Sequence, residues 1–421
     1  MAVAESIISN IRDTKLINFL KTKGVVRSVG ERGMHLHLWL SKIIDEGRIS
    51  KEEVNRCLYP ELMYGNRRLI RFYELKNVRK IKRENDWKSF LQKYDCPGMN
   101  FNRILETTFS DNGRLKVAAM NTTISSGVIQ KSEILFVYRM KIRSKETEQE
   151  IYVYSYLPVS FDLLSKTLTI KVWNREEGEE YNTPTDQLNY VYEKISKKLA
   201  FETRYITIDP QSVLYKMSKA LFDDFFKQLP NIEEITAKKA DMPHLVHELL
   251  TGVTLQNAES DNGKIAMNTE VINVKEEMYK LLQQVALYDY LKDNNIKMLL
   301  KNTDKYISKI RFNDRDNLTA SLTSEKGVRC IFDAKTFMCV RNSLDLVESI
   351  VAIVVAFVKD KGLLSVKYDA SDRQFLNIHI LHNRYYSEED YGKIWELYKR
   401  YESEENAVTG SVRLEDNVAA M

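Results

Sequence analysis

Two stretches near the middle of the chain decide the fold: ILFVYRMKI at residues 134–142 and IYVYSYLPV at residues 151–159. Both are rich in β-branched and aromatic residues, which pack well on the pleated surface of a sheet. The wider segments 102–119, 125–143 and 150–174 carry the alternating pattern that is typical of strands with one buried face. The sequence therefore predicts a sheet in the middle of the protein.

Helical spacing flanks this predicted sheet on both sides. Apolar residues recur near the helical period over 5–21, 186–199 and 211–228, which predicts a helix in each segment. Residues 229–270 lose this pattern and are the expected domain boundary. A pair of helices is expected over 274–300.

A second α+β unit is expected over residues 306–401, in the order strand, strand, strand, helix, strand, strand, helix. Its central helix is expected to begin near Asn342 or Ser343, which are both suitable N-caps, and to end at Gly362. The apolar run from Ile350 to Val358 lies inside this expected helix. Its nine residues are too few for the roughly 20 that span a bilayer, so the run predicts a buried helix and no membrane anchor.

Three aspartates each precede a short polar stretch and a strand-like pattern: Asp162, Asp333 and Asp369. Aspartate suits the first position of a turn because its carboxylate accepts a hydrogen bond from a nearby backbone N–H. A hairpin turn is therefore expected at each of them.

The N-terminal quarter contains a recognisable helix start. Ser50 and Glu53 match the Ser-x-x-Glu capping box, so a helix is expected to begin at Lys51 and to stop at Pro60. An apolar helical stretch at 34–44 precedes it, and the turn between them contains glycine. This outline resembles a helix-turn-helix, which would bind DNA; a helical hairpin without a DNA role is the commoner alternative.

Together these patterns predict an α+β fold, with a helical, basic N-terminal region followed by two mixed α+β units with mainly antiparallel sheets. The expected domains are a helix-turn-helix-like basic region at 1–95, a β-rich α+β domain at 96–235, a helical linker region at 236–300, a C-terminal α+β domain at 301–401 and a disordered tail at 402–421.

Positive charge gathers in the first quarter of the chain. The whole chain has a net charge of +4, whereas residues 1–100 hold 20 basic against 12 acidic side chains. The densest part, 67–88, also contains Phe72, Tyr73 and Trp87. Basic side chains neutralise phosphates and aromatic rings stack on bases, so the mixture predicts a nucleic-acid surface; a solvated, salt-bridged face is the alternative. The residues expected to bind nucleic acid are Arg67, Arg68, Arg71, Lys76, Arg79, Lys80, Lys82, Arg83 and Lys88.

A different function class, a Mg²⁺-dependent nuclease, is indicated by the triplet Asp333-Ala334-Lys335 with Asp316 upstream. In such enzymes two carboxylates hold Mg²⁺ and a lysine orients the attacking water. The same triplet also fits a turn between two strands in VRCIFDAKTFMCVR, which would leave Asp333 and Lys335 at a solvent-facing tip. Both interpretations stay open at this point.

Several other enzyme classes lack their motifs. The chain contains no G-x-x-x-x-G-K-[ST], G-x-G-x-x-G or G-x-S-x-G, which excludes a P-loop ATPase, a standard dinucleotide-binding fold and an α/β-hydrolase elbow. His244 and His247 stand in HLVHE, which matches neither zinc-protease signature. The four cysteines form no C-x-x-C pair, which argues against a zinc site and a disulfide framework and favours the cytoplasm.

We therefore expect a non-enzymatic intracellular nucleic-acid-binding or adaptor subunit of a larger assembly. DNA is favoured over RNA, protein partners are expected, and no membrane contact or cofactor is. The alternatives are the nuclease, with Mg²⁺ as its cofactor, and a protein–protein scaffold. The scaffold is considered because the chain contains 23 tyrosines and 16 phenylalanines, side chains that are common at protein interfaces. The lysine- and isoleucine-rich composition further suggests, as a hypothesis, a role in phage–host conflict and antiviral defence.

Overall fold

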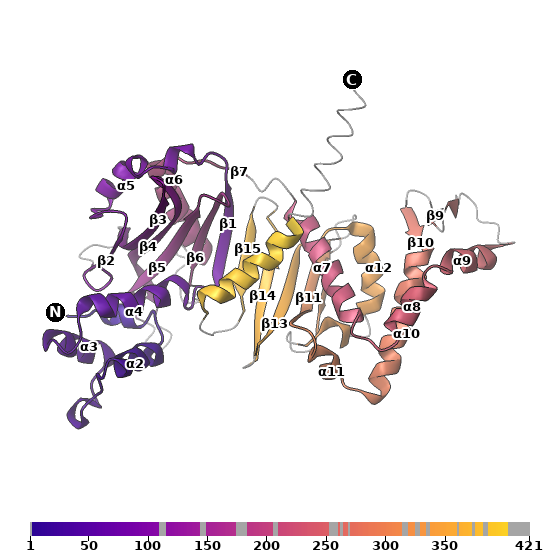
Figure 1. The fold of residues 1–421 in the computed structure, drawn as a ribbon, viewed down its shortest axis with the longest axis horizontal. Coiled ribbons are helices and arrows are strands. Elements are labelled where there is room, and N and C mark those ends of the chain that lie inside the picture. Colours follow the sequence, from indigo (N-terminus) through magenta and orange to yellow (C-terminus); the bar gives the residue numbers. More distant parts are fainter. Residues whose placement is uncertain are drawn as a thin grey trace, which may run out of the picture. The chain divides into compact units, whose positions relative to one another are not determined.

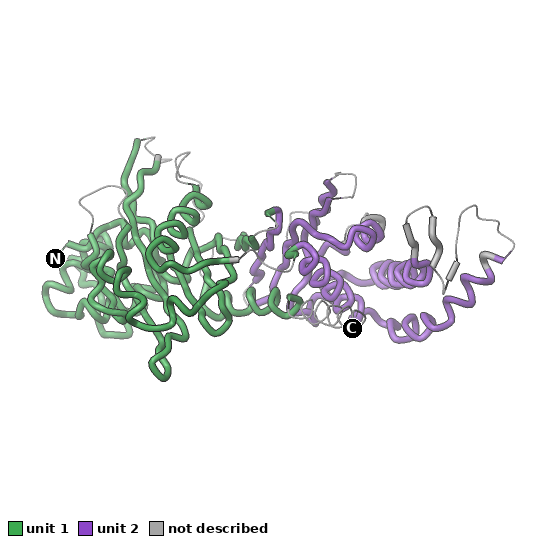
Figure 2. The backbone as a smooth tube through the Cα atoms, turned by 90° about the horizontal axis from the view of Figure 1, so that it is seen from above, with its two compact units in different colours: residues 1–210, 372–421 green, residues 211–371 purple. Residues whose placement is uncertain are grey.

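The chain forms two compact units in the computed structural model (Figure 2). Unit 1 contains residues 1–210 and 372–421, and unit 2 contains residues 211–371. Both units combine helices with antiparallel strands, so the protein is α+β as predicted. The structure describes residues 2–108, 115–143, 149–173, 183–204, 209–251, 260–261, 264–267, 270–313, 319–324, 329–333, 337–359, 362–372, 375–381 and 386–402. The expected tail therefore lies, beyond Glu402, outside the described residues.

Unit 1 begins with short helices. The expected helix over 5–21 is two helices, with a break at residues 9–12. A 3-10 turn, η1, and the helices α3 and α4 follow along the chain. These elements are α1 (Glu5–Ile8), α2 (Asp13–Thr22), η1 (Val29–Glu31), α3 (Leu36–Asp45) and α4 (Lys51–Tyr64).

The expected start of α4 is confirmed and its expected end is wrong. The Ser50 side chain accepts a hydrogen bond from the Glu53 backbone N–H at 3.2 Å, which completes the capping box. Pro60 lies inside the helix. A proline removes one backbone hydrogen bond, and the turn beyond it buries Leu62 and Met63 completely, which offsets that loss.

The sheet of unit 1 is antiparallel, in the order β15-β1-β6-β5-β4-β3-β2, and β7 also pairs with β1 (Figure 1). The predicted stretches 134–142 and 151–159 lie on β4 and β5, where Ile134 is opposite Val159. The strands are β1 (Leu69–Leu75), β2 (Phe101–Asn102), β3 (Lys116–Ser125), β4 (Val128–Arg143), β5 (Glu150–Asp162), β6 (Thr167–Val172), β7 (Thr203–Arg204) and β15 (Leu376–Ile380).

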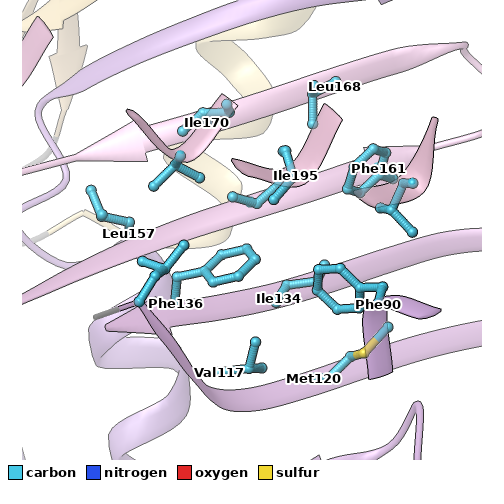
Figure 3. Close-up of a cluster of buried hydrophobic side chains, with 14 of the residues drawn as sticks. Phe90, Val117, Met120, Ile134, Phe136, Leu157, Phe161, Leu168, Ile170 and Ile195 are labelled. Carbon is cyan, nitrogen blue, oxygen red and sulfur yellow. The ribbon is translucent and has the colours of Figure 1, made fainter. Parts of the chain in front are cut away.

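Helices cover both faces of this sheet. On one face, α5 (Lys88–Lys93) and α6 (Pro184–Leu199) contribute Phe90 and Ile195 to an apolar core with Phe136 and Phe161 of the strands (Figure 3). On the other face lie α4 and a final helix over 388–402, whose Trp395 stacks on Phe72 of β1 at 3.8 Å between ring centroids. The side chains of β1 are therefore enclosed from both sides.

The position of β1 explains why the observed units differ from the expected domains. β1 belongs to the expected region 1–95, yet it lies inside the sheet between β6 and β15. β15 and the final helix come from the expected C-terminal domain and also belong to unit 1. The expected boundary over 229–270 falls within unit 2, whereas the contacts divide the chain after residues 210 and 371.

Unit 2 contains a sheet in the order β12-β11-β13-β14, a small sheet in the order β10-β9-β8, and several helices. The predicted helices over 211–228 and 274–300 are confirmed as α7 and as the pair α10 and α11. The elements are α7 (Pro210–Phe226), α8 (Ile232–Lys238), α9 (Met242–Leu250), β8 (Ser260–Asp261), β9 (Lys264–Met267), β10 (Glu270–Asn273), α10 (Val274–Asp293), α11 (Ile296–Leu300), β11 (Lys305–Asn313), β12 (Thr319–Thr323), η5 (Ile331–Asp333), α12 (Phe337–Val347), β13 (Ala352–Lys359) and β14 (Gly362–Asp369).

Two predictions for this unit are wrong. The run 350–358, expected to be a buried helix, contains most of strand β13, and the central helix is instead α12. β13 is a middle strand with both faces largely buried, so its residues are apolar without alternation, and such a run cannot be told from a buried helix by periodicity. No helix within the described residues is both long and apolar enough to cross a membrane.

The expected aspartate turns have different outcomes. The Asp162 carboxylate accepts hydrogen bonds from the Leu164 and Ser165 backbone N–H groups at 3.0 Å each, between β5 and β6. Asp369 accepts one from the Ser371 N–H at 3.0 Å, after β14. Asp333 begins no hairpin, because it ends the 3-10 turn η5, and α12 follows.

Candidate nucleic-acid interface

The residues expected to bind nucleic acid fall into a buried and an exposed group. Arg67 is fully buried, Arg71 is 7% exposed, and Arg68 is partly buried. A guanidinium enclosed in the protein cannot reach a phosphate at the surface. Arg67 and Arg71 are therefore not part of the expected surface. Arg67 lies just before β1 and Arg71 lies on it, and β1 is inside the sheet.

Arg71 has polar partners inside unit 1. Its Nε donates to Asn377 Oδ1 of β15 at 2.8 Å, and one terminal nitrogen donates to Asn189 Oδ1 of α6, also at 2.8 Å. The guanidinium also lies 5.1 Å from the centroid of the Phe375 ring. Arg71 thus connects a strand and a helix to β1, which is a structural role.

The aromatic residues interleaved with the basic ones are also buried. Trp87 is fully buried, and Phe72 and Tyr73 are 8% and 3% exposed. Trp87 Nε1 donates to the Ile81 carbonyl at 3.0 Å, and its ring packs edge-on against Phe161. The expected stacking surface for bases is therefore absent from the described part of this segment.

The remaining basic residues lie on or beside two 3-10 turns after β1, η2 (Arg79–Ile81) and η3 (Glu84–Trp87). Arg79 and Lys80 are on η2, and the others lie before, between or after the two turns. The turns are held by Ile81 and Trp87, which point into the core and leave their neighbours at the surface. Five of these basic residues make no ion pair within the described part of the chain, whereas Lys76 lies 4.0 Å from Glu202. The exposed or partly exposed set is Lys76, Arg79, Lys80, Lys82, Arg83 and Lys88.

These turns lie at one end of the sheet of unit 1, together with two hairpin tips. The Ile129 N–H at the start of β4 donates to the Lys82 carbonyl at 2.8 Å. The Leu75 N–H at the end of β1 donates to the carbonyl of Lys166, in the β5–β6 turn, also at 2.8 Å. Lys166 is exposed and thereby joins the basic group. Sequence reasoning missed it because the chain separates it from the basic stretch by some eighty residues, and only strand pairing brings it close.

We call Lys76, Arg79, Lys80, Lys82, Arg83, Lys88 and Lys166 the cationic end of unit 1. Glu84 and Asp86 are the acidic residues within the two turns, and Asp86 accepts a hydrogen bond from the Arg83 backbone N–H at 2.9 Å. Cations therefore outnumber acids at this place. Side chains of this kind, fixed on short turns and open to solvent, can neutralise phosphates.

The predicted helix-turn-helix helices, α3 and α4, are both present, but α4 packs as an internal helix. Its Asn55 donates to the Asn102 carbonyl at 3.2 Å and to Glu106 at 3.1 Å, and accepts from the Leu105 N–H at 2.9 Å. Base reading requires an exposed helix face that can enter a groove. The exposed residues of α4 are Lys51, Glu52, Arg56 and Pro60.

A polar cluster that sequence reasoning missed lies on the α4 side of the sheet. Lys171 of β6 is 6% exposed, and its ammonium lies 4.2 Å from the Tyr64 ring centroid and 4.4 Å from that of Tyr391. Tyr64 and Tyr59 donate to the two carboxylate oxygens of Glu133 at 3.0 and 3.2 Å. Burial lowers the pKa of Lys171 to about 8.

Two further contacts connect the final helix to this cluster. Tyr391 Oη donates to the carbonyls of Tyr64 and Arg67, 2.6 Å from each. Lys131 lies 2.8 Å from Glu133 and 3.6 Å from the exposed Glu388. The cluster therefore joins α4, the sheet and the final helix, and no spacing in the sequence indicates it.

The residues of the alternative nuclease site lie largely outside the described part of the chain. Asp316 and Lys335 lie outside the described residues, as does the side chain of Asp333. Among described residues, no group of three or more His, Cys, Asp or Glu side chains could hold a metal ion. His244 and His247 lie on α9, which begins at Met242.

The described candidates are exposed cations at the end of a sheet and a closed polar cluster on its face. The cationic end offers donors to an anionic backbone, and its aromatic residues face inward. The chain matches no protein-family model and no curated protein sequence.

Proposed function

We propose that the protein is a non-enzymatic, intracellular nucleic-acid-binding subunit of a larger assembly, and that it contacts phosphates through the cationic end of unit 1. The observation that carries the proposal is the exposure of Arg79, Lys80 and Arg83 on or beside two short turns, where they make no ion pair with a described residue. A cation without a neighbouring carboxylate contributes a more favourable free energy of binding to a phosphate, because no existing ion pair has to be broken.

The inward position of the aromatic residues supports duplex over single-stranded nucleic acid. Sequence-tolerant binding of single strands uses exposed rings on which bases stack. Trp87 and Tyr73 are buried, so phosphate contact is the mode that the described residues favour. Duplex DNA, which presents regularly spaced phosphates, is the proposed ligand.

The test compares two triple charge reversals in the full chain by fluorescence anisotropy with labelled duplex DNA. The first variant carries Arg79→Glu, Lys80→Glu and Arg83→Glu. We expect it to lose most of its affinity, and the slope of log affinity against log salt to flatten by about one for each lost phosphate contact.

The matched control carries Lys197→Glu, Lys292→Glu and Lys393→Glu, with the same change of net charge. Each of these lysines is exposed and lies near an acid on its own helix. Equal losses in both variants would mean that binding depends on net charge and not on the cationic end. Salt-independent binding, or no binding by the unaltered protein, would also contradict the proposal.

The other function classes have less support. The scaffold interpretation depended on exposed aromatic side chains, and in the described part of the chain Tyr152, at 43%, is the aromatic residue among the exposed large hydrophobics. The Mg²⁺-dependent nuclease, the antiviral role and the cytoplasmic location stay predictions. Adding Mg²⁺ to the DNA samples tests the nuclease directly, because cleavage that is lost in Asp333→Ala would support it.

A further inference from the structure

Helix α10 in unit 2 has an unusual distribution of side chains. Two of its buried residues are polar, Lys280 and Gln283, at 7% and 2% exposed, and the third is Leu287 at 1%. Leu281 and Val285, in contrast, are 56% and 57% exposed. A helix in a globular protein normally turns its apolar stripe inward. A polar inward stripe indicates that α10 faces something other than an apolar core, and such departures from local rules concentrate at functional sites.

The inward stripe of α10 faces a hollow of about 1460 Å³ within unit 2. One face each of α7, α8 and α12 completes its lining, and these helices lie together with α10 in Figure 1. Aromatic side chains, among them Phe222, Phe226 and Tyr279, form part of the wall. The volume exceeds the roughly 300–1,000 Å³ of pockets for small ligands, so the hollow suits a longer molecule.

The walls of the hollow are fixed by polar contacts between helices. Lys280 of α10 pairs with Glu277 at 2.6 Å and with Asp345 of α12. Tyr215 Oη of α7 donates to the same Asp345 carboxylate at 2.8 Å. Lys239, next to α8, pairs with Glu276 of α10 at 2.7 Å. The charges used in these contacts are therefore already paired within the protein.

A buried arginine in the wall makes no direct ion pair with a described carboxylate, although the charges of Asp345, Asp223 and Glu277 act on it. Arg341 of α12 is 7% exposed, donates to the neutral Gln283 Oε1 at 2.8 Å, and lies 4.8 Å from the Phe226 ring centroid. Within the described residues it makes no ion pair. Burial lowers the pKa of Arg341, which reflects the cost of enclosing this charge. An anionic group of a ligand would offset that cost.

Other lining charges lack an ion pair as well. In the described part of the chain these are the cation Lys219 and the carboxylates Asp223, Glu233 and Glu348. With Arg341, the unpaired set holds three carboxylates against two cations. This excess of negative charge disfavours a polyanion such as nucleic acid, and it favours a ligand with several positive groups and one negative group.

We propose that the hollow binds a peptide segment of a partner protein, which places one carboxylate on Arg341 and basic side chains against Asp223, Glu233 and Glu348. The aromatic wall takes the apolar side chains of that segment. This site is separate from the cationic end and goes beyond the proposed contact with nucleic acid. Peptides match the hollow because they combine positive, negative and apolar groups along one extended chain.

The test is a selection of random heptapeptides, displayed with a free C-terminal carboxylate, on the immobilised full-length protein. We expect enrichment of peptides that contain lysine or arginine and one carboxylate. A synthetic copy of an enriched peptide should lose about tenfold or more in affinity when its carboxylate is replaced by an amide, because a charge-assisted hydrogen bond to Arg341 is lost. No enrichment over an uncoated surface, or enrichment of acidic peptides, would overturn the proposal.

Two neighbouring aspartates provide a matched pair of variants. Asp223 and Asp224 are both exposed on α7, but Asp223 lines the hollow, whereas Asp224 lies 3.2 Å from Lys227 and does not. Asp223→Asn should weaken the enriched basic peptide several-fold and Asp224→Asn should leave its affinity unchanged. Equal affinities for both variants would place the peptide elsewhere. Melting curves for both variants, and for Arg341→Gln, separate loss of binding from loss of folding.

Discussion

The basic stretch 67–88 divides into two halves that are both positively charged but differ in burial and in their position relative to the sheet. In its first half, Arg67 and Arg71 lie next to or on a central strand, enclosed by helices on both faces of the sheet. In its second half, Arg79 on η2 and Arg83, directly before η3, lie at the end of the same sheet and are exposed. The comparison shows that an arginine on a strand inside the sheet makes contacts within the protein, whereas an arginine beyond the end of the sheet is available to a ligand.

Three predictions test this division between interior and surface charges, in decreasing order of expected effect on stability. The largest concerns Glu133, whose negative charge raises the pKa of the buried Lys171 and so partly offsets the effect of burial. Glu133→Ala should lower the free energy of unfolding by about 3–5 kcal/mol, because a buried charge is left without its counter-charge. Urea denaturation measures it.

The control for this variant is Glu388→Ala. Glu388 lies 3.6 Å from Lys131, as Glu133 lies 2.8 Å from it, but its side chain is 69% exposed. A surface pair contributes about 0–1 kcal/mol, so this variant should be nearly as stable as the unaltered protein. Equal losses for both variants would show that burial does not distinguish the two carboxylates.

The second prediction compares Arg71 with Arg79. Arg71→Met should lower the free energy of unfolding by about 2 kcal/mol, because the side chains of Asn189 and Asn377 lose their donor. It should leave DNA affinity unchanged while the protein is folded. Arg79→Met should do the opposite, with a stability change below about 0.5 kcal/mol and weaker binding. If Arg71→Met weakened binding as much as Arg79→Met, the division of the basic stretch would be wrong.

The third prediction concerns pH. Burial lowers the pKa of Lys171 to about 8, so above pH 8 the folded protein loses this proton while the unfolded chain keeps it up to its usual value. The unfolded state then binds more protons, and a rise in pH favours the folded state. Relative to Lys171→Met, the unaltered protein should gain about 2 kcal/mol of stability between pH 8 and pH 10.

The difference from Lys171→Met is required because other groups titrate in the opposite sense. Burial raises the pKa of Cys57 and of Cys96 to about 11, so the unfolded chain loses those protons first and stability falls as pH rises above about 9. These contributions are common to both proteins and cancel. Parallel stability curves across this pH range would show that Lys171 ionises as an exposed lysine does.

Local patterns predicted the elements whose signals are local. The Ser50–Glu53 capping box begins α4, and the turn at Asp162 joins β5 and β6, because both depend on hydrogen bonds within a few residues. The alternating stretches of β4 and β5 were also recognisable, since each strand has faces in different environments. The run 350–358 was misassigned because β13 is buried on both faces and has no alternation.

The candidate sites were less predictable than the fold. The approach of Lys166 to the end of β1 depends on strand pairing, and the cluster around Lys171 collects side chains from α4, β4, β6 and the final helix. The hollow of unit 2 likewise requires four helix faces to meet. None of these arrangements has a fixed spacing along the chain.

The sequence by itself determined the class of the fold, the strands at the centre of unit 1 and the place where positive charge is concentrated. Only the tertiary structure decided which of those charges are available to a partner. The physical reason is that helix and strand patterns arise from contacts between near neighbours, whereas exposure depends on what covers a residue. Trp395 and Asn377, which lie more than 300 residues beyond β1, help to cover Phe72 and Arg71.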